Sequence, residues 1–229
     1  ELNFAAVTAT NWRVTFSTAI GATPCAPWLE EWQLYPASTG GGIIAKYNLM
    51  GAGSATELWN TKYLHPESLA GIFNAVVISP RDSSRIYGFG STEHSTYNLS
   101  LNKGMALCVN TSGATIWQKD YSQVSEFYDA AATEDGGFLL AGTVYTGTSV
   151  QARSAVIMKI DKDGNVDTKF PQTFKDPSQL GNDGRGIIET RDGGILMVGG
   201  NSDPVNRSQP YLVKLDRFYR PCSSGVPCE

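Results

Sequence analysis

The chain has 229 residues, of which 41% are hydrophobic, with a formal net charge of −4 and a pI near 5.3. This apolar content is typical of a globular chain and argues against a disordered one. The acidic balance argues against a nucleic-acid surface, which normally needs clustered Lys and Arg. No apolar stretch approaches the roughly 20 residues of a membrane span, and no nucleic acid is expected among the partners.

The first predicted unit opens with strands at 3–10 and 12–17, where apolar and polar residues alternate. A long connection spans 21–36, and two more strands follow at 42–48 and 57–63. The abundance of Gly, Pro, Thr, Ser and Asn favours such short strands and turns over long helices.

The second unit repeats this plan, with predicted strands at 73–78, 85–90, 105–110 and 114–121. Trp59 and Trp117 fall at matching places in the two units, and so do Tyr63 and Tyr121. The third unit lacks this Trp and has a weaker fourth strand, and the fourth unit ends without a clear fourth strand.

A repeated stretch links the third and fourth units. Residues 129–142 contain a small-residue strand, a turn at Asp-Gly-Gly and an apolar strand that ends in Gly, and the same features return at 187–200. Recurrence at this spacing indicates a repeat architecture. Units of roughly 50 to 60 residues with three or four antiparallel strands are typical of propeller blades, which bury their faces against one another.

The sequence therefore predicts an all-β fold, a β-propeller of about four blades with three to four antiparallel strands each. It forms either a closed ring or part of a larger propeller. The predicted domain is 1–220, followed by a Cys-bearing tail at 221–229; the blades are 1–66, 72–122, 127–175 and 184–220.

Two stretches resemble known propeller repeats. The pattern T-x-D-G-G-F-L-L-A-G, followed by V-I-M-K-I-D-x-D-G, resembles repeats of secreted and surface bacterial β-propellers, and 106–117 resembles the quinoprotein-type repeat. The resemblance implies a propeller fold and an extracellular or cell-surface location, and it does not imply one activity, because this fold carries many functions.

The leading functional prediction is a non-enzymatic module for binding, adhesion or structural assembly, with a protein, a glycan or copies of itself as partner. The alternatives are a polysaccharide-active hydrolase or lyase and a sugar-binding lectin. No catalytic residues are assigned: His65 and His94 lack a nucleophile motif, and the acids cannot be paired from the sequence. Those acids are Glu30, Glu31, Glu67, Glu93, Glu126 and Asp129.

One turn carries oxygen-bearing side chains at alternate positions: Asp161, Asp163, Asn165 and Asp167. Such spacing can direct several oxygens at one calcium ion, whereas a plain hairpin turn with Asp-Gly at positive φ is the other interpretation. No other cofactor is expected.

Two residue types recur from unit to unit. Asp82, Asp135 and Asp192 share one turn, where a structural role is favoured over a binding rim. Lys159 and Lys214, with Lys46 similarly placed, are predicted as solvated strand residues rather than as an anion-binding ring.

Cys222 and Cys228 are close together in a turn-rich segment, which predicts a small disulfide loop, and Cys25 with Cys108 is a further candidate pair. Asn98, Asn110 and Asn206 match the N-glycosylation pattern. In the long connection, Trp28, Trp32 and Tyr35 predict either a binding lip for sugars or proteins or a cap on the first blade.

Overall fold

The computed structural model describes residues 32–36, 41–49, 55–64, 68–94, 98–147, 149, 152–175, 180–202 and 208–222. The chain is all-β, as the sequence predicts, with 14 strands and one short 3-10 turn in these ranges. None of the described helical segments is long and apolar enough to cross a membrane.

The strands form four units that follow one another along the chain. Unit 1 contains β1 (Trp32–Pro36), β2 (Gly41–Leu49) and β3 (Ala55–Leu64). Unit 2 contains β4 (Ala70–Ser79), β5 (Asp82–Glu93), η1 (Leu99–Leu101), β6 (Lys103–Asn110) and β7 (Thr115–Tyr121). Unit 3 contains β8 (Glu126–Ala132), β9 (Phe138–Tyr145), β10 (Arg153–Ile160) and β11 (Gln172–Phe174), and unit 4 contains β12 (Gly181–Glu189), β13 (Ile195–Ser202) and β14 (Ser208–Leu215).

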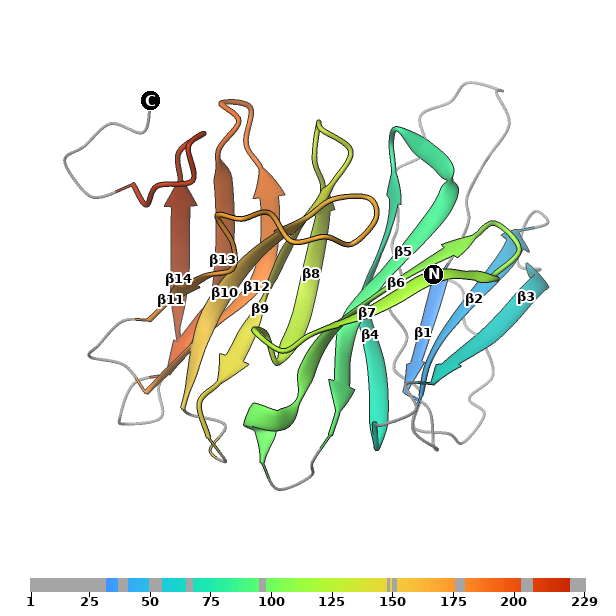
Figure 1. Cartoon of the computed structure of the whole chain (residues 1–229), viewed down its shortest axis with the longest axis horizontal. Coiled ribbons are helices and arrows are strands. Elements are labelled where there is room, and N and C mark those ends of the chain that lie inside the picture. The colour runs from blue at the N-terminus through green and yellow to red at the C-terminus, as the bar shows by residue number, and fades with distance from the viewer. Residues whose placement is uncertain are drawn as a thin grey trace.

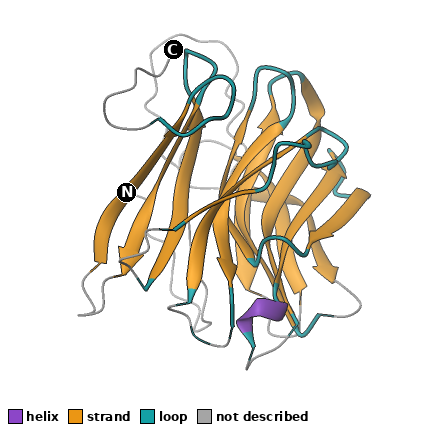
Figure 2. Cartoon of the chain, turned by 60° about the vertical axis from the view of Figure 1, so that its left-hand side comes forward, coloured by secondary structure: helices purple, strands orange, loops and turns teal. Residues whose placement is uncertain are grey.

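Within each unit, strands that follow one another in the chain pair antiparallel. Units 3 and 4 are joined into one seven-stranded sheet by a single parallel pair, Arg153 opposite Gly181. Figure 1 shows the units in chain order across the molecule, from β1–β3 in blue on one side to β12–β14 in orange and red on the other. Figure 2, turned by 60°, shows the strands side by side through the molecule, with the short helix η1 at one end.

Three apolar cores lie between the four units. The first joins units 1 and 2 around Ile44 and Phe73, the second joins units 2 and 3 around Tyr87 and Phe138, and the third joins units 3 and 4 around Ile157. The first strand of each later unit provides the contact, because β4 lies on β1 and β2, β8 lies on β4 and β5, and β12 lies on β8 and β9.

Burial follows from this stacking. Residues of β6, β9 and β10 are buried on both faces, whereas the buried residues of β13 are separated by partly or fully exposed ones. A sheet between two others reads as a continuous apolar run, and a sheet covered on one face reads as an alternating one. Among the described strands, the sheets stack without closing into a barrel, and a ring of four blades is not shown.

The structure corrects the long connection predicted for 21–36, because its last five residues form β1 and pair with β2 from Trp32 opposite Lys46 to Pro36 opposite Gly42. The aromatic residues in this segment have high strand propensity, and they favour pairing over a loop. The strands predicted at 3–10 and 12–17 lie outside the described residues.

The candidate pairing of Cys25 with Cys108 is also corrected. Cys108 is a free thiol in β6, fully buried in the core between units 2 and 3. Burial raises the pKa of Cys108 to about 11, so the group is a neutral part of the core. Cys228 lies outside the described residues, and its disulfide with Cys222 stays a prediction.

The turn after the third strand has the same hydrogen bonds in units 2, 3 and 4. Asn110, Asp161 and Asp216 each accept hydrogen bonds through Oδ1 from the backbone N–H groups two and four residues later, at 2.8–3.0 Å. The residue three positions on adopts positive φ: 83° at Gly113, 77° at Gly164 and 67° at Tyr219. Side-chain acceptance of turn N–H groups fixes this geometry.

The preceding unit holds each turn from outside. Trp59 covers Gly113 and Trp117 covers Gly164, so closely that an added Cβ would lie 2.7 Å and 3.0 Å from the respective indole rings. The hydroxyls of Tyr63 and Tyr121 donate to the carbonyls of the same glycines, at 2.6 Å and 2.9 Å. The matching Trp and Tyr residues of the sequence are therefore clamps between units.

Unit 3 lacks the Trp, and the structure shows what replaces it. Gln172 of β11 donates to the carbonyl of Tyr219 at 3.0 Å, as the tyrosines do in the earlier units. The Tyr219 ring packs edge-on against Phe170 at 5.0 Å between ring centroids. Its hydroxyl accepts a hydrogen bond from Lys159 Nζ at 2.9 Å. The aromatic contact between units thus comes from the turn itself.

We predict that Gly164→Ala lowers the free energy of unfolding by about 2 kcal/mol, because an L-residue at this φ is strained and its Cβ would press on Trp117. Gly147→Ala is the control, since nothing lies within 4 Å of an added Cβ there, and it should change stability by less than about 0.5 kcal/mol. Urea denaturation measures both, and equal effects would contradict the clamp.

Tyr219→Gly should also destabilise the protein, although Gly occupies this position in units 2 and 3. Relief of the positive φ returns about 1 kcal/mol, whereas loss of the packed ring costs about 2 kcal/mol or more. Tyr219→Phe keeps the ring, so its stability should lie between those of the parent chain and the Tyr219→Gly variant. A Tyr219→Gly variant more stable than the parent chain in the same denaturation experiment would refute this account.

Candidate binding site

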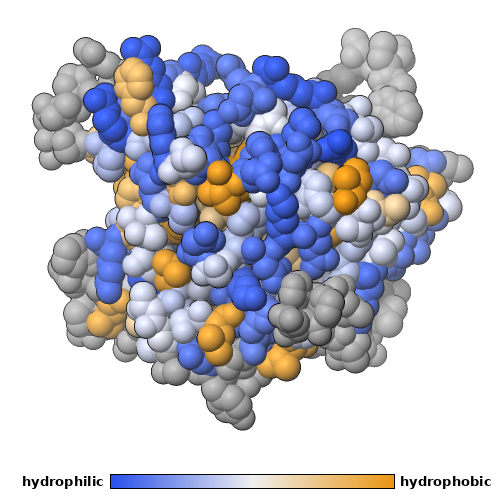
Figure 3. Space-filling model, in the orientation of Figure 1, coloured by the Kyte–Doolittle hydropathy of each residue, from blue (hydrophilic) through white to orange (hydrophobic). Residues whose placement is uncertain are grey.

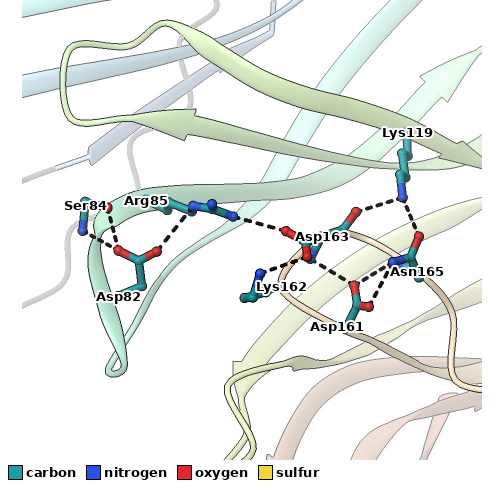
Figure 4. Close-up of polar contacts among 8 residues, drawn as sticks. All are labelled: Asp82, Ser84, Arg85, Lys119, Asp161, Lys162, Asp163 and Asn165. Carbon is teal, nitrogen blue, oxygen red and sulfur yellow. Dashed lines mark hydrogen bonds and ion pairs between the residues drawn. The ribbon is translucent and has the colours of Figure 1, made fainter.

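The turn predicted to bind calcium lies between units 2 and 3, where donors reach its oxygens (Figure 4). Asp161 accepts the turn N–H groups and, through Oδ2, the side-chain amide of Asn165 at 2.9 Å. Asp163 accepts from Arg85 Nη1 at 3.2 Å and from Lys162 Nζ at 2.8 Å. Burial alone would raise the pKa of Asp161, but the hydrogen bonds from Asn165 and Asp163 outweigh it and lower that pKa.

The remaining predicted ligands are engaged in the same way. Asn165 Oδ1 accepts from Lys119 Nζ at 3.0 Å, and Asp167 Oδ1 accepts the backbone N–H of Lys169 at 2.9 Å. Within the described part of the chain, no group of three or more His, Cys, Asp or Glu is placed to hold a metal ion. These contacts stabilise the turn and join it to unit 2. Calcium binding stays a prediction.

The recurring Asp and Lys residues form one structural motif. Asp135 Oδ1 accepts from Thr133 Oγ1 at 2.5 Å and from the N–H of Gly137 at 3.1 Å, and Oδ2 accepts from Lys159 Nζ at 2.6 Å. In unit 4, Asp192 accepts in the same way from Thr190, Gly194 and Lys214. The structural role expected for the aspartates is seen in these contacts.

The expectation of solvated lysines is wrong for Lys159, whose side chain is only 11% exposed and is paired with Asp135. Lys214 is 23% exposed and paired with Asp192. Lys46 lies in β2. Each of the two paired lysines reaches from the third strand to the first turn of its own unit. The ion pair therefore depends on how the strands pair in the sheet, and residue spacing along the sequence does not predict it.

The other predicted sites are only partly described. Asn98 caps the start of η1, and Asn110 is the last residue of β6, at the start of a turn. Their Oδ1 atoms accept hydrogen bonds from Ser100 Oγ and Ser112 Oγ, each at 2.7 Å. Asn206 and Trp28 lie outside the described residues, and so do the side chains of Trp32 and Tyr35 in β1. Glycosylation and an aromatic lip stay predictions.

Among the described residues considered for catalysis, three lie at different places in the sheets. His94 Nε2 lies 3.0 Å from Thr92 Oγ1 and 3.7 Å from Asp120 Oδ2 at one end of unit 2, and Glu93 is the last residue of β5. Asp129 accepts the N–H of Ile187 at 2.9 Å, which joins β8 to β12. His65, Glu30, Glu31 and Glu67 lie outside the described residues.

Sequence reasoning missed a row of bulged residues on the first strands of units 2, 3 and 4. The pairing register shifts around Asn74, Tyr128 and Arg185. Asn74 donates to the carbonyl of Phe127 at 2.8 Å and to Glu126 Oε1 at 3.2 Å. The bulges therefore turn polar side chains from one unit toward the next, as bulges near functional sites often do.

At the end of this row, an arginine-lined hollow opens on unit 4. Asp183 Oδ2 accepts from Arg153 at 3.3 Å and from Arg185 at 2.8 Å. The hollow has a volume of about 480 Å³; its remaining lining comes from Val198, Gly199, Gly200, Asn201 and Ser202.

Burial and ion pairing fix the charge states of Arg185 and Tyr128 beside the hollow. The Arg185 guanidinium stacks on the Tyr128 ring, 3.7 Å from its centroid. Burial alone would lower the pKa of Arg185, but the hydrogen bond to Asp183 outweighs it and raises that pKa. Burial, followed by the negative charge of Glu126, raises the pKa of Tyr128 well above its usual value. Arg185 is therefore a permanent cation, and Tyr128 is neutral.

One sequence signal could have located this hollow. The stretch Asn182-Asp183-Gly184-Arg185 places two charges in a first strand, where unit 2 carries Gly-Ile-Phe-Asn at 71–74. A charged pair in an otherwise apolar or small-residue strand departs from the repeat, and such a departure marks a residue with its own role.

No protein-family model matches the sequence, and no curated protein matches it. Among solved structures, the chain is similar to a protein of unknown function from Bacteroides caccae, with 14% identity and a TM-score of 0.41. The similarity covers 81% of this chain and 63% of that protein, so this chain spans less than two thirds of its length.

Asp135→Asn should lower stability at neutral pH by about 1 kcal/mol, a value kept small because the Asp135 side chain is 59% exposed. Burial alone would raise the pKa of Asp135, but the hydrogen bonds from Lys159 and Thr133 outweigh it and lower the pKa to about 2. A depressed carboxyl pKa stabilises above the unfolded value near 4. The gap to the parent chain should therefore close as pH falls from about 4 to about 2.

Asp192→Asn is the matched variant in unit 4, because Asp192 has the same contacts with a threonine, a turn N–H and a lysine. The hydrogen bonds from Thr190 and Lys214 also lower the pKa of Asp192, so its stability gap should close as pH falls in the same way. Denaturation midpoints measured across the acid range give both results. A gap for Asp135→Asn that stays constant down to pH 2 would refute the ion pair as its cause.

Proposed function

We propose that the chain is a non-enzymatic binding and assembly module, built as a β-propeller of about four blades or as part of a larger one. Its partner surface is the uncovered face of unit 4, and its occupant is a further antiparallel sheet of the same design. An extracellular or cell-surface location is part of this proposal and is supported by the resemblance of the repeats to those of secreted propellers.

The observation that carries the proposal is an apolar row on the last sheet. Val198 and Leu212 lie directly opposite each other on β13 and β14, and Ile188 lies diagonally on β12. Their side chains are 45%, 62% and 53% exposed, whereas their neighbours Ile187, Met197 and Val213 on the opposite face are buried against unit 3. Exposed apolar side chains grouped on one face indicate an interaction surface.

The stacking of the described units supports this choice of occupant. Units 1, 2 and 3 are each covered by the first strand of the next unit. Continuation of the same pattern would place another small-residue strand on β12, β13 and β14. Among the described residues, the face of the molecule seen in Figure 3 has no comparable apolar row, since hydrophilic residues predominate there and hydrophobic ones are scattered.

The described carboxylates support a binding role over a hydrolase or lyase. Catalysis by paired acids needs two carboxyl groups facing one cleft. Asp135 and Asp192 are paired with lysines, Asp183 with two arginines, and Asp129 with a strand N–H. The two lysine pairs stabilise turns within their own units, and the contacts of Asp183 with Arg153 and of Asp129 with the N–H of Ile187 join units 3 and 4. Structural contacts of this kind support a scaffold.

Leu212→Lys tests the assembly surface. We expect the free energy of unfolding to fall by about 1 kcal/mol or more, or the solution mass to fall, because the ammonium group would have to enter a sheet interface. Leu101→Lys is the control, since Leu101 is 51% exposed in η1 and away from the last sheet. Light scattering and urea denaturation measure both variants; a Leu212→Lys chain unchanged in both would refute the proposal.

A further inference from the structure

We propose that the arginine-lined hollow of unit 4 binds a carboxylate-bearing sugar of the uronic acid class. The inference rests on the proposed binding role and names its ligand; it uses the hollow, which shares Val198 with the apolar row. Neither the repeats nor the comparisons assign a ligand to this place.

The charges of the hollow favour an anion. Arg153 and Arg185 approach the same oxygen of Asp183, so that two cations share one lining carboxylate. Glu126 also acts on Arg185, but more weakly than Asp183 does. The described lining of the hollow therefore contains two arginines and one carboxylate, an arrangement that accommodates a second carboxylate from a ligand.

The shape of the Arg185 side chain adds directional preference. Its Nε and Nη2 atoms donate to Asp183 at 3.2 Å and 2.8 Å, so one edge of the guanidinium is used. The side chain is 53% exposed and held flat on Tyr128. The second edge, formed by the two Nη atoms, has the geometry that binds a carboxylate through two parallel hydrogen bonds.

Asn201 sets a second requirement, which is that the ligand carries a hydrogen-bond donor. This residue is 7% exposed and lines the hollow, and no donor from the described residues reaches its buried Oδ1. A buried acceptor without a partner is costly. A hydroxyl donor on the ligand would satisfy this acceptor.

The floor of the hollow suits a sugar ring. Gly200 leaves the backbone bare, and its added Cβ would lie no closer than 3.4 Å to any atom. Val198 offers an apolar edge to the C–H face of a pyranose. The volume of about 480 Å³ lies within the range of about 300–1,000 Å³ typical of small-molecule sites.

The test is calorimetric titration of the full chain with a galacturonic acid trisaccharide, a neutral glucose trisaccharide, a short glutamate peptide and inorganic phosphate. We expect the uronate to bind, and the other three to bind at least tenfold more weakly. Added salt should weaken uronate binding, because the arginine contact is partly exposed. A neutral sugar bound equally well, or a peptide or phosphate bound better, would overturn the proposal.

Two variants locate the binding. Arg185→Gln should weaken uronate binding at least tenfold while the chain still folds, because Arg153 still pairs with Asp183. Gly200→Val should block the hollow while every charged residue of the lining is kept, although its side chain would lie against Asp183, 3.4 Å from an added Cβ. Arg220→Gln is the matched control, an exposed arginine paired with Asp216 after β14, and it should leave binding unchanged.

The two proposals fail separately. Absence of uronate binding in a chain whose Leu212→Lys variant is destabilised would overturn the ligand and leave the assembly role standing. Equal loss of binding in Arg185→Gln and Arg220→Gln would show a diffuse charge effect and would also overturn the hollow as the site.

Discussion

The packing of one twisted sheet on the next is the constraint on which the rest of this structure depends. A sheet of three or four strands has two faces, and it cannot bury either face by itself. The three cores between four units solve this problem for the inner sheets, which are buried on both faces. Phe127 shows how closely the units approach, since an added Cβ on Gly104 would lie 2.6 Å from its ring.

Most of the recurring polar residues serve that same packing. The Asx turns shape the backbone at the edge of each unit, and the clamps of Tyr63, Tyr121 and Gln172 tie each turn to the unit before it. Where the Trp clamp is missing, Tyr219 accepts a positive φ and supplies the aromatic contact from the other side. An aromatic contact between the turn and the preceding unit is thus present at each of these interfaces, although different residues make it. The repeats therefore have this interface in common.

Residues that depart from the repeat are therefore the informative ones for function. Asp183 and Arg185 have uncharged counterparts, Ile72 and Asn74, in unit 2, and they meet Arg153 at the end of the bulge row. The apolar row of unit 4 lies on the same sheet as this hollow. Assembly and ligand binding would thus be carried by unit 4 together with Arg153 of unit 3, while units 1 and 2 provide a support.

The sequence by itself determined the all-β class, the strands from β2 onward and the turns that join them, because hydrophobic alternation and Asp-Gly turns are local signals. It also determined that Trp59 and Trp117 are equivalent. Tertiary structure decided the partners: the pairing of β1 with β2, the burial of Cys108 and the ion pair between Asp135 and Lys159. The hollow likewise depends on a register shift that brings Arg153 and Arg185 to one oxygen, and contacts between distant strands leave no periodic trace along the chain.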